Sequence, residues 1–237
     1  MPKVKLFVEL VQHTYDPQGI IALAAKLCYS DADILELKNG VESKDQSKFI
    51  QRLMDMGHES PLEHASFTFA ISGVSRSFLA QITRHRIASF SVQSQRYVGQ
   101  KHDVGEFNYI LPPTIEQMGE VAIRKYHEQM ATMQKWYNEW VDALGNAGES
   151  SNEDARFVLP NAAETRMLVT MNVRELLHFF ELRCCSRAQW EIREVAWQML
   201  AKCKEVAPIL FQYAGPRCSH GECREGTKSC KRSKKLA

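Results

Sequence analysis

The sequence predicts an α+β fold, in which a mixed, largely antiparallel sheet packs with helices. Phe67, Phe69 and Ile71 alternate with smaller residues, as in a half-buried strand, and residues 165–171 also have strand character. Apolar residues at helical spacing lie around these strands, without the regular rhythm of a parallel βαβ sheet. The 237 residues are 44% apolar and 24% charged, which is enough for one sizeable core. We therefore expect a single domain over residues 1–215, followed by a basic, cysteine-containing tail over residues 216–237.

Two helices are expected ahead of the first strand. One begins at Pro17 and places apolar side chains on one face at Ile20, Leu23, Ala24 and Leu27. The other ends at Gly57, a residue type common at helix C-termini, and its apolar residues are Phe49, Ile50, Leu53 and Met54. Packing against the core explains both faces.

The strand at residues 67–71 is expected to end at Gly73. Ser75 is then expected to cap a short helix, because its hydroxyl can accept a hydrogen bond from a backbone N–H. This helix carries Phe78, Leu79 and Ile82, and we expect it to run into the basic triplet Arg84, His85 and Arg86.

The second half of the chain is expected to continue the mixture of helices and strands. An extended segment at 104–111 ends at the two prolines that follow it, since proline cannot donate to a sheet or lie inside a helix. The expected elements after them are a long helix at 114–144, a loop at 145–152, the strand at 165–171 and helices at 173–183 and 187–206.

Composition excludes several classes of protein. The longest apolar stretches are far shorter than the roughly 20 residues of a membrane span, and the N-terminus lacks the pattern of a secretory signal, so we expect a cytoplasmic protein with no membrane partner. Seven scattered cysteines indicate reduced thiols. Residues 217–237 carry a net charge of +5 and the rest of the chain −3, so the body is not a polyanion-binding surface.

The densest polar segment is residues 84–97, where four basic residues and several hydroxyls occur without a carboxylate. One interpretation is that the basic triplet at 84–86 only complements a helix C-terminus. The other is an anion site: in an extended segment Ser94 and Arg96 lie on the same side and can hold one phosphate between a hydroxyl and a guanidinium. The chain has no glycine-rich phosphate loop, so a nucleotide site would have to be built in this other way.

A second polar cluster opens the expected helix at 173–183. Asn172 can cap this helix, and Arg174 and His178 are four residues apart on one face, an arrangement that favours a phosphate or pyrophosphate. A commonplace cap and a packed histidine are the alternative. Arg183 is nine residues beyond Arg174, which places it on the opposite face about 13.5 Å further along. We therefore expect Arg183 to serve a different ligand or another subunit's site.

Other basic residues give weaker signals. Arg156 precedes an apolar segment, and Arg166 is interpreted as part of a structural salt bridge. His58 and His64 resemble a metal motif only superficially, because Pro61 breaks the helix that the ligand spacing would need, and no metal site is assigned.

These residues together resemble a known family. Arg84-His85-Arg86, seven residues and Ser94 match the RHRx7S signature of flavin-dependent thymidylate synthases. The segments 57–64 (GHESPLEH), 155–160 (ARFVLP) and 172–191 are also similar to that family, in the same order along about residues 20–213.

The resemblance implies methylation of dUMP to dTMP, with methylenetetrahydrofolate as carbon donor and NADPH-reduced FAD as hydride carrier. It also implies a homotetramer whose active sites lie between subunits. The FAD contacts that it implies are Ser60, Arg84, His85, Arg86, Val92, Asn172, Val173, Arg174 and His178. The implied dUMP contacts are Gln81, Arg84, Val92, Gln93, Ser94, Gln95, Arg96, Arg156 and Arg183.

The side chains suggest their own roles within that reaction. A permanently charged, planar guanidinium suits the negative charge that develops on uracil when its C5 becomes nucleophilic, and Arg183 is our candidate catalytic residue. Ser94, Arg96 and Arg156 offer donors for the nucleotide phosphate. The family usually has Glu or Gln where this chain has Val92; either backbone groups act there or the neighbouring Gln93 substitutes.

Two alternative functions and the tail remain open at this stage. A flavoprotein that oxidises NADPH without methylation is the rival enzyme, and a nucleic-acid-binding module could use the arginine cluster and the basic tail, although the negative body argues against it. Cys218, His220, Cys223 and Cys230 could bind zinc, but they lack CxxC spacing, and a mobile tail is the preferred interpretation. We expect truncation after Ala214 to preserve activity.

Overall fold

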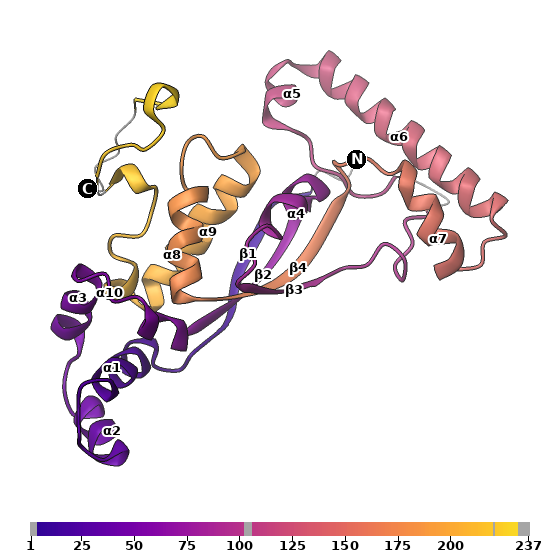
Figure 1. The fold of residues 1–237 in the computed structure, drawn as a ribbon. Coiled ribbons are helices and arrows are strands. Elements are labelled where there is room, and N and C mark those ends of the chain that lie inside the picture. The colour runs from indigo at the N-terminus through magenta and orange to yellow at the C-terminus, as the bar shows by residue number, and fades with distance from the viewer. Residues whose placement is uncertain (1–3, 102–105, 220, 232–237) are drawn as a thin grey trace. The chain divides into compact units, whose positions relative to one another are not determined.

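The computed structural model describes residues 4–101, 106–219 and 221–231 (Figure 1). The chain divides into two compact units. Unit 1 comprises residues 1–7, 71–82 and 91–168, and unit 2 comprises residues 8–70, 83–90 and 169–237. The chain is a mixture of helices and strands, as predicted.

Four strands form one sheet in the order β1-β2-β4-β3, namely β1 (Phe7–His13), β2 (Ser66–Ser75), β4 (Glu164–Asn172) and β3 (Ala88–Val92). The sheet is antiparallel, which confirms the predicted strand arrangement. Its register is marked by Thr68 and Thr170, whose hydroxyl oxygens are 2.8 Å apart on neighbouring strands. Strands β2 and β4 were predicted from the sequence, whereas the two outer strands, β1 and β3, were not.

Strand β2 continues two residues beyond its predicted end. Gly73 has a φ of +69° and lies inside the strand, not after it. A Cβ atom there would lie 2.1 Å from the carbonyl oxygen of Lys5, so only glycine allows this close approach of two backbones. Ser75 caps the next helix as predicted, because its Oγ accepts from the N–H of Phe78 at 3.0 Å.

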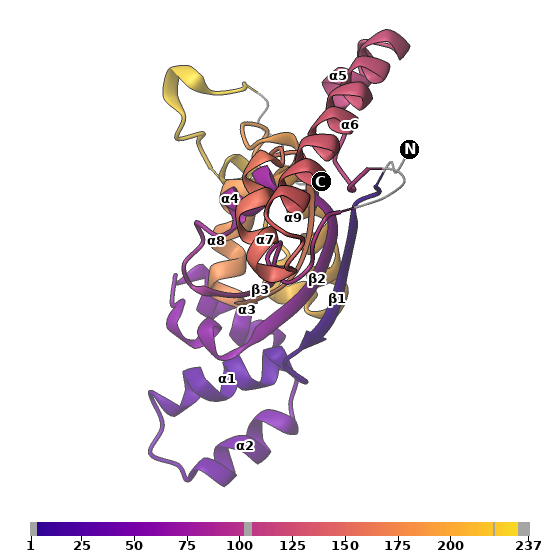
Figure 2. The same ribbon diagram turned by 90° about the vertical axis from the view of Figure 1, so that its right-hand side faces the viewer.

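Unit 1 contains α4 (Arg76–Ile82), α5 (Pro113–Gln117), α6 (Glu120–Ala143), α7 (Glu149–Ala155) and the short 3-10 helix η2 (Arg156–Val158). In both views α7 lies beside the C-terminal part of α6 (Figures 1 and 2). The buried apolar residues of unit 1 form two clusters. One contains Phe107, Tyr109 and Met130, and the other contains Tyr137, Val141 and Ala155.

Two predictions for unit 1 were wrong. The single helix at 114–144 is two helices, because Gly119 adopts a φ of +90° and interrupts the chain between α5 and α6. The loop at 145–152 becomes helical at Glu149, where the buried Ser151 accepts from the N–H of Ala147 at 2.9 Å. In the extended segment predicted at 104–111, positions 104 and 105 lie outside the described residues, and Tyr109 forms an isolated antiparallel bridge with Ala163.

Unit 2 carries the remaining helices. They are α1 (Pro17–Leu27), α2 (Ile34–Glu42), α3 (Ser47–Asp55), η1 (Ser60–His64), α8 (Val173–Arg183), α9 (Trp190–Val206), α10 (Pro208–Phe211), η3 (Arg217–Ser219) and η4 (Gly226–Lys228). Helices α8 and α9 pack together (Figure 1). The Phe211 ring meets Phe67 and Phe180 edge-on, with centroids 5.5 and 6.0 Å away.

Helices α1, α3 and α8 lie where the sequence predicted them. Two details of unit 2 differ from the prediction, the buried face of α1 and the start of α9. The buried side of α1 is formed by Ile21, Ala22 and Ala25, one position away from the predicted face. Helix α9 begins at Trp190 and not at 187, because the Gln189 side chain accepts from the N–H groups of Glu191 and Ile192 and caps it there. Among the residues described, no helix is long and apolar enough to cross a membrane.

Candidate functional site

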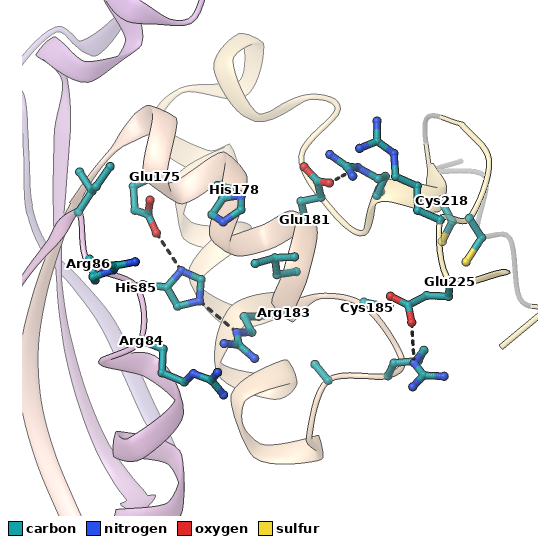
Figure 3. A pocket seen from close by; sticks show the side chains of 17 residues that line it. Arg84, His85, Arg86, Glu175, His178, Glu181, Arg183, Cys185, Cys218 and Glu225 are labelled. Carbon is teal, nitrogen blue, oxygen red and sulfur yellow. Dashed lines mark hydrogen bonds and ion pairs between the residues drawn. The ribbon is translucent and has the colours of Figure 1, made fainter. Parts of the chain in front are cut away.

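The basic triplet lies in a connection and not at the end of a helix. Helix α4 ends at Ile82, and residues 84–86 follow in the turn before β3. These residues line a cavity of about 730 Å³ within unit 2, together with α8, the connection to α9 and part of the tail (Figure 3). Its basic and acidic lining residues are Arg84, His85, Arg86, Glu175, His178, Glu181, Arg183, Arg187, Arg217, Arg224 and Glu225.

A chain of hydrogen bonds crosses one wall of this cavity (Figure 3). His85 Nδ1 lies 2.8 Å from Glu175 Oε1, and Arg183 Nε donates to His85 Nε2 at 3.1 Å. Burial lowers the pKa of His85, and the Arg183 charge lowers it further, whereas the bond to Glu175 raises it. The net direction is downward, so His85 is held as a neutral imidazole that connects a carboxylate to a guanidinium.

Arg183 and Arg84 bring two positive charges to the same cavity. Burial lowers the pKa of Arg183, and the Arg84 charge adds to this effect. An arginine remains protonated under such a shift, so the two cations repel one another until an anion lies between them. The arrangement therefore suits a negatively charged or strongly polar ligand.

A second cavity, of about 550 Å³, holds the predicted Asn172, Arg174 and His178. His178 lines both cavities, while Arg183 lines the first and Arg174 the second. The expectation that Arg183 serves a different ligand from Arg174, or another subunit's site, stays a prediction; the Arg183 side chain reaches His85 in the first cavity. The two cavities adjoin along α8.

Arg174 is not free in this second cavity. Its Nη1 donates to Glu63 Oε1 at 2.5 Å, and its Nε donates to Glu59 Oε2 at 3.2 Å. The bond to Glu63 and the two negative charges raise the pKa of Arg174. The guanidinium is about half exposed, so a stronger anion can compete with these carboxylates.

The N-terminus of α8 contributes less to anion binding than the sequence suggested. Asn172 caps it as predicted, since its side-chain oxygen accepts from the N–H of Glu175 at 2.9 Å. The N–H of Val173 donates to the carbonyl oxygen of Ala65 at 2.9 Å. Two of the first backbone donors are thus used within the protein, and the Arg174 guanidinium is the positively charged group that remains there. Ser60 lies exposed at the start of η1.

The predicted phosphate loop belongs to unit 1 and is a turn. The Ser94 carbonyl accepts from the N–H of Val98 at 3.0 Å, so residues 94–98 are not extended and the same-side argument for Ser94 and Arg96 was wrong. Arg96 forms ion pairs with Glu149 at 2.5 Å and Glu153 at 3.1 Å, both from α7. Its guanidinium is therefore held by carboxylates, as Arg174 is in unit 2.

The other predicted substrate residues of unit 1 lie on separate elements. Gln81 donates to the Ser77 carbonyl within α4 at 3.4 Å, and Arg156 Nε donates to the Glu153 carbonyl at 3.1 Å. The Arg156 charge and burial lower the pKa of Arg76, with burial the larger effect. Val92 ends β3, and the N–H of Gln93 donates to the Arg166 carbonyl at 3.0 Å.

The chain is similar in sequence to known proteins over most of its length. The family described as thymidylate synthase complementing protein matches residues 9–209. The chain is 46% identical to the flavin-dependent thymidylate synthase of Clostridium tetani, over 94% of this chain and 92% of that protein. It is 48% identical to the Geobacter sulfurreducens enzyme of that name, over 94% and 93%, and 44% identical to that of Pyrococcus furiosus, over 92% and 89%.

The chain belongs to the flavin-dependent thymidylate synthase family. The resemblance stated from the sequence is thereby confirmed, and the chain is an enzyme of this family. The matched residues 9–209 include the RHRx7S segment, α8 and Arg183. The described part of the tail lies outside that match.

The site residues predicted for this member of the flavin-dependent thymidylate synthases lie in both units. Unit 2 holds all the predicted flavin residues except Val92, together with Arg183; they are Ser60, Arg84, His85, Arg86, Asn172, Val173, Arg174 and His178. Unit 1 holds Gln81, Val92, Gln93, Ser94, Gln95, Arg96 and Arg156. The cavities described above lie within unit 2 alone.

The sequence analysis missed the acidic partners of these basic residues. Glu175 contacts His85, a pair of glutamates holds Arg174, and another pair holds Arg96. Only the i, i+4 spacing of Glu59 with Glu63 and of Glu149 with Glu153 could have indicated shared faces.

The tail also contributes to the first cavity, which the sequence did not predict. Arg217 pairs with Glu181 of α8, and Arg187 pairs with Glu225 at 3.1 Å. No group of three or more metal-ligating side chains occurs among the described residues, and His220, one of the four zinc candidates, lies outside them.

Proposed function

We propose that this enzyme methylates dUMP to dTMP, taking the carbon unit from methylenetetrahydrofolate and using FAD reduced by NADPH. The observation that carries this proposal is the joining of Arg84, His85 and Arg183 in one cavity of a chain that belongs to this family. We further propose that residues 1–215 are the catalytic domain and that the reaction takes place in the cytoplasm, which the reduced thiols of Cys184 and Cys203 support.

The donor set of unit 2 fits FAD. A dinucleotide presents a pyrophosphate and a polar ring system, and it needs cations together with neutral donors over a long, partly open site. Arg174 and Asn172 line one cavity, Arg84 and Arg86 line the next, and His178 lines both. We propose that these residues, with Ser60 and the backbone of Val173, hold the cofactor. When bound, FAD supplies the hydride and relays the one-carbon unit.

Arg183 is proposed to bind the uracil ring. Making C5 of uracil nucleophilic moves negative charge onto N3 and the carbonyl oxygens of the ring. Two guanidinium N–H groups in one plane can donate to adjacent ring atoms, and the charge of Arg183 persists despite its lowered pKa. The bond to His85 restricts the guanidinium to one orientation, which places these donors before the substrate arrives.

The phosphate of dUMP is proposed to bind in unit 1. Ser94, Arg96 and Arg156 supply one hydroxyl and two guanidinium groups, and Gln81 and Gln95 supply amides. Arg96 would exchange its contacts with Glu149 and Glu153 for the phosphate oxygens, which accept stronger charge-assisted hydrogen bonds. Val92 and Gln93 would contribute backbone groups there. We propose a homotetramer in which these groups meet the unit 2 cavities of other subunits.

The two buried cysteines, Cys184 and Cys203, do not supply a nucleophile in this proposal. Burial raises the pKa of Cys184 to about 12 and that of Cys203 well above its ordinary value, so both remain thiols. This agrees with chemistry in which the carbon unit passes through the cofactor and no bond forms between the protein and the uracil ring.

The experiment that tests the function is product analysis with reagents omitted in turn. We expect the purified, FAD-loaded protein to form dTMP only when dUMP, methylenetetrahydrofolate and NADPH are all present. NADPH consumption without dTMP under the complete conditions would instead support the rival function of a flavin-dependent NADPH oxidase. A protein that neither binds FAD nor forms dTMP would overturn the proposal.

A further inference from the structure

Glu175 is a buried acidic residue that the proposed reaction does not use. It belongs to the first turn of α8, where the partial positive charge of the helix N-terminus favours a carboxylate, and only 7% of its surface is exposed. Its Oε1 lies 2.8 Å from Nδ1 of His85, which is itself 5% exposed. Burying a carboxylate is unfavourable unless it is paired. The contact with His85 supplies that pairing, and we ask what it does for the site.

The two bonds of His85 determine where its proton lies. The Nε of an arginine carries a hydrogen and has no lone pair to offer, so it can only donate. The bond from Arg183 Nε at 3.1 Å therefore requires Nε2 of His85 to be unprotonated. A neutral imidazole then carries its proton on Nδ1, and that proton is donated to Glu175.

We propose that Glu175 is a positioning residue, which fixes the Nδ1–H tautomer of His85 and thereby orients the guanidinium of Arg183. This inference rests on the function proposed above, in which Arg183 binds the uracil ring. Without the carboxylate, His85 can move its proton to Nε2, where an N–H would face the N–H of Arg183. Two donors cannot bond to one another, so Arg183 would turn away from its place in the cavity.

The other groups around His85 do not replace Glu175. The ring of Phe179 packs edge-on at 5.0 Å between centroids and offers no acceptor, while the His178 ring is 6.0 Å away. Arg84 and Arg183 are cations on the cavity side. Among these neighbours only the glutamate can accept the Nδ1 proton at hydrogen-bond distance.

Three variants separate this role from a general effect of charge. Glu175→Leu removes the acceptor, Glu175→Gln keeps an acceptor oxygen without the charge, and Glu194→Gln removes an exposed carboxylate of α9 as a matched control. We expect Glu175→Leu to lower kcat for dTMP formation about 10-fold to 100-fold, the loss typical for a hydrogen bond to a charged group. Glu175→Gln should lower kcat clearly less than Glu175→Leu, by about 3-fold to 10-fold, because a neutral acceptor forms a weaker hydrogen bond than a charged one, and the control should be unchanged.

The tautomer itself is measured by ¹⁵N NMR of histidine-labelled full-length protein without ligands. The two ring nitrogens have distinct shifts, and we expect His85 to show a protonated Nδ1 in the parent and in Glu175→Gln, and a protonated Nε2 in Glu175→Leu. A protonated Nε2 or an imidazolium in the parent protein would overturn the proposal, even if Glu175→Leu fails to fold. A Glu175→Gln variant as impaired as Glu175→Leu would also overturn it. Failure of the parent protein to make dTMP would refute the proposed function and leave the NMR test of the tautomer standing.

Discussion

Arg174 and Glu63 form an ion pair of 2.5 Å, and Glu59 holds the same guanidinium at 3.2 Å. The group proposed to bind the FAD pyrophosphate thus already has two carboxylate partners. Any anionic ligand of Arg174 has to displace these carboxylates and then experiences their negative charge. They therefore oppose the binding of an anion while holding the guanidinium beside η1.

Removing both carboxylates should strengthen FAD binding. For Glu59→Gln combined with Glu63→Gln we expect a dissociation constant about 2-fold to 10-fold lower at low salt, because exposed ion pairs contribute only modestly and the lost negative charges no longer oppose the anion. The gain should shrink as salt screens these charges. Flavin fluorescence titration measures it, with Glu42→Gln, from an exposed pair on α2, as control. Weaker binding in the double variant would show that the glutamates position Arg174 for FAD.

Substitution of Arg183 should separate the two half-reactions. We expect Arg183→Ala to lower dTMP formation about 100-fold or more while NADPH still reduces the flavin at a rate near that of the parent protein. Arg183→Lys should restore little, because an ammonium lacks the planar pair of donors. Stopped-flow absorbance of the flavin and product analysis measure the two rates. An equal loss of both activities in Arg183→Ala would contradict the assignment of this residue to the substrate.

The cysteines should differ sharply in reactivity. Burial raises the pKa of Cys184 to about 12, so only about one molecule in ten thousand is a thiolate at pH 8. We expect iodoacetamide to label the exposed Cys28 within minutes and to leave Cys184 and Cys203 unlabelled until the protein is unfolded. Peptide mass spectrometry over time checks this. Rapid labelling of Cys184 in the folded protein would contradict the burial of its thiol.

Truncation after Ala214 should leave the enzyme folded and active. The removed residues include Arg217 and Glu225, whose ion pairs with Glu181 and Arg187 are partly exposed, so each contributes at most about 1 kcal/mol. Loss of the tail residues that line the first cavity opens it on that side, but Arg84 and Arg183 remain in place. Thermal unfolding and dTMP formation measure the outcome. A truncated protein that is folded yet inactive would show that the tail takes part in the reaction.

The elements that the sequence revealed are those with a local signal. Helix α8 has an asparagine cap at its start, and β4 precedes it directly. Strands β1 and β3 were not predicted. Most of β1 is exposed or half-exposed and shows no regular alternation, and β3 has only five residues. Pairing with neighbouring strands therefore determines their structure. The break at Gly119 depends on a positive φ. A glycine permits this conformation, but its presence in a sequence does not predict it.

The site was predictable to the extent that its residues belong to recognisable segments. The resemblance to the family identified Arg84, His85 and Arg183 as site residues, and in the structure all three line one cavity. The contact of His85 with Glu175 spans 90 positions, and no periodicity or spacing relates two residues so far apart. The bent turn at Ser94 was missed for a similar reason, since its geometry depends on hydrogen bonds within the folded chain.

The most direct test of the account is a single turnover without oxygen. FAD-loaded protein is reduced, freed of NADPH, and mixed with dUMP and methylenetetrahydrofolate, while flavin absorbance and dTMP are followed together. If reduced FAD supplies the hydride at a site ordered by Arg183, flavin reoxidation should proceed in step with dTMP, one product for each flavin reoxidised. Flavin that stays reduced under these conditions, or that reoxidises without dTMP, would contradict the account.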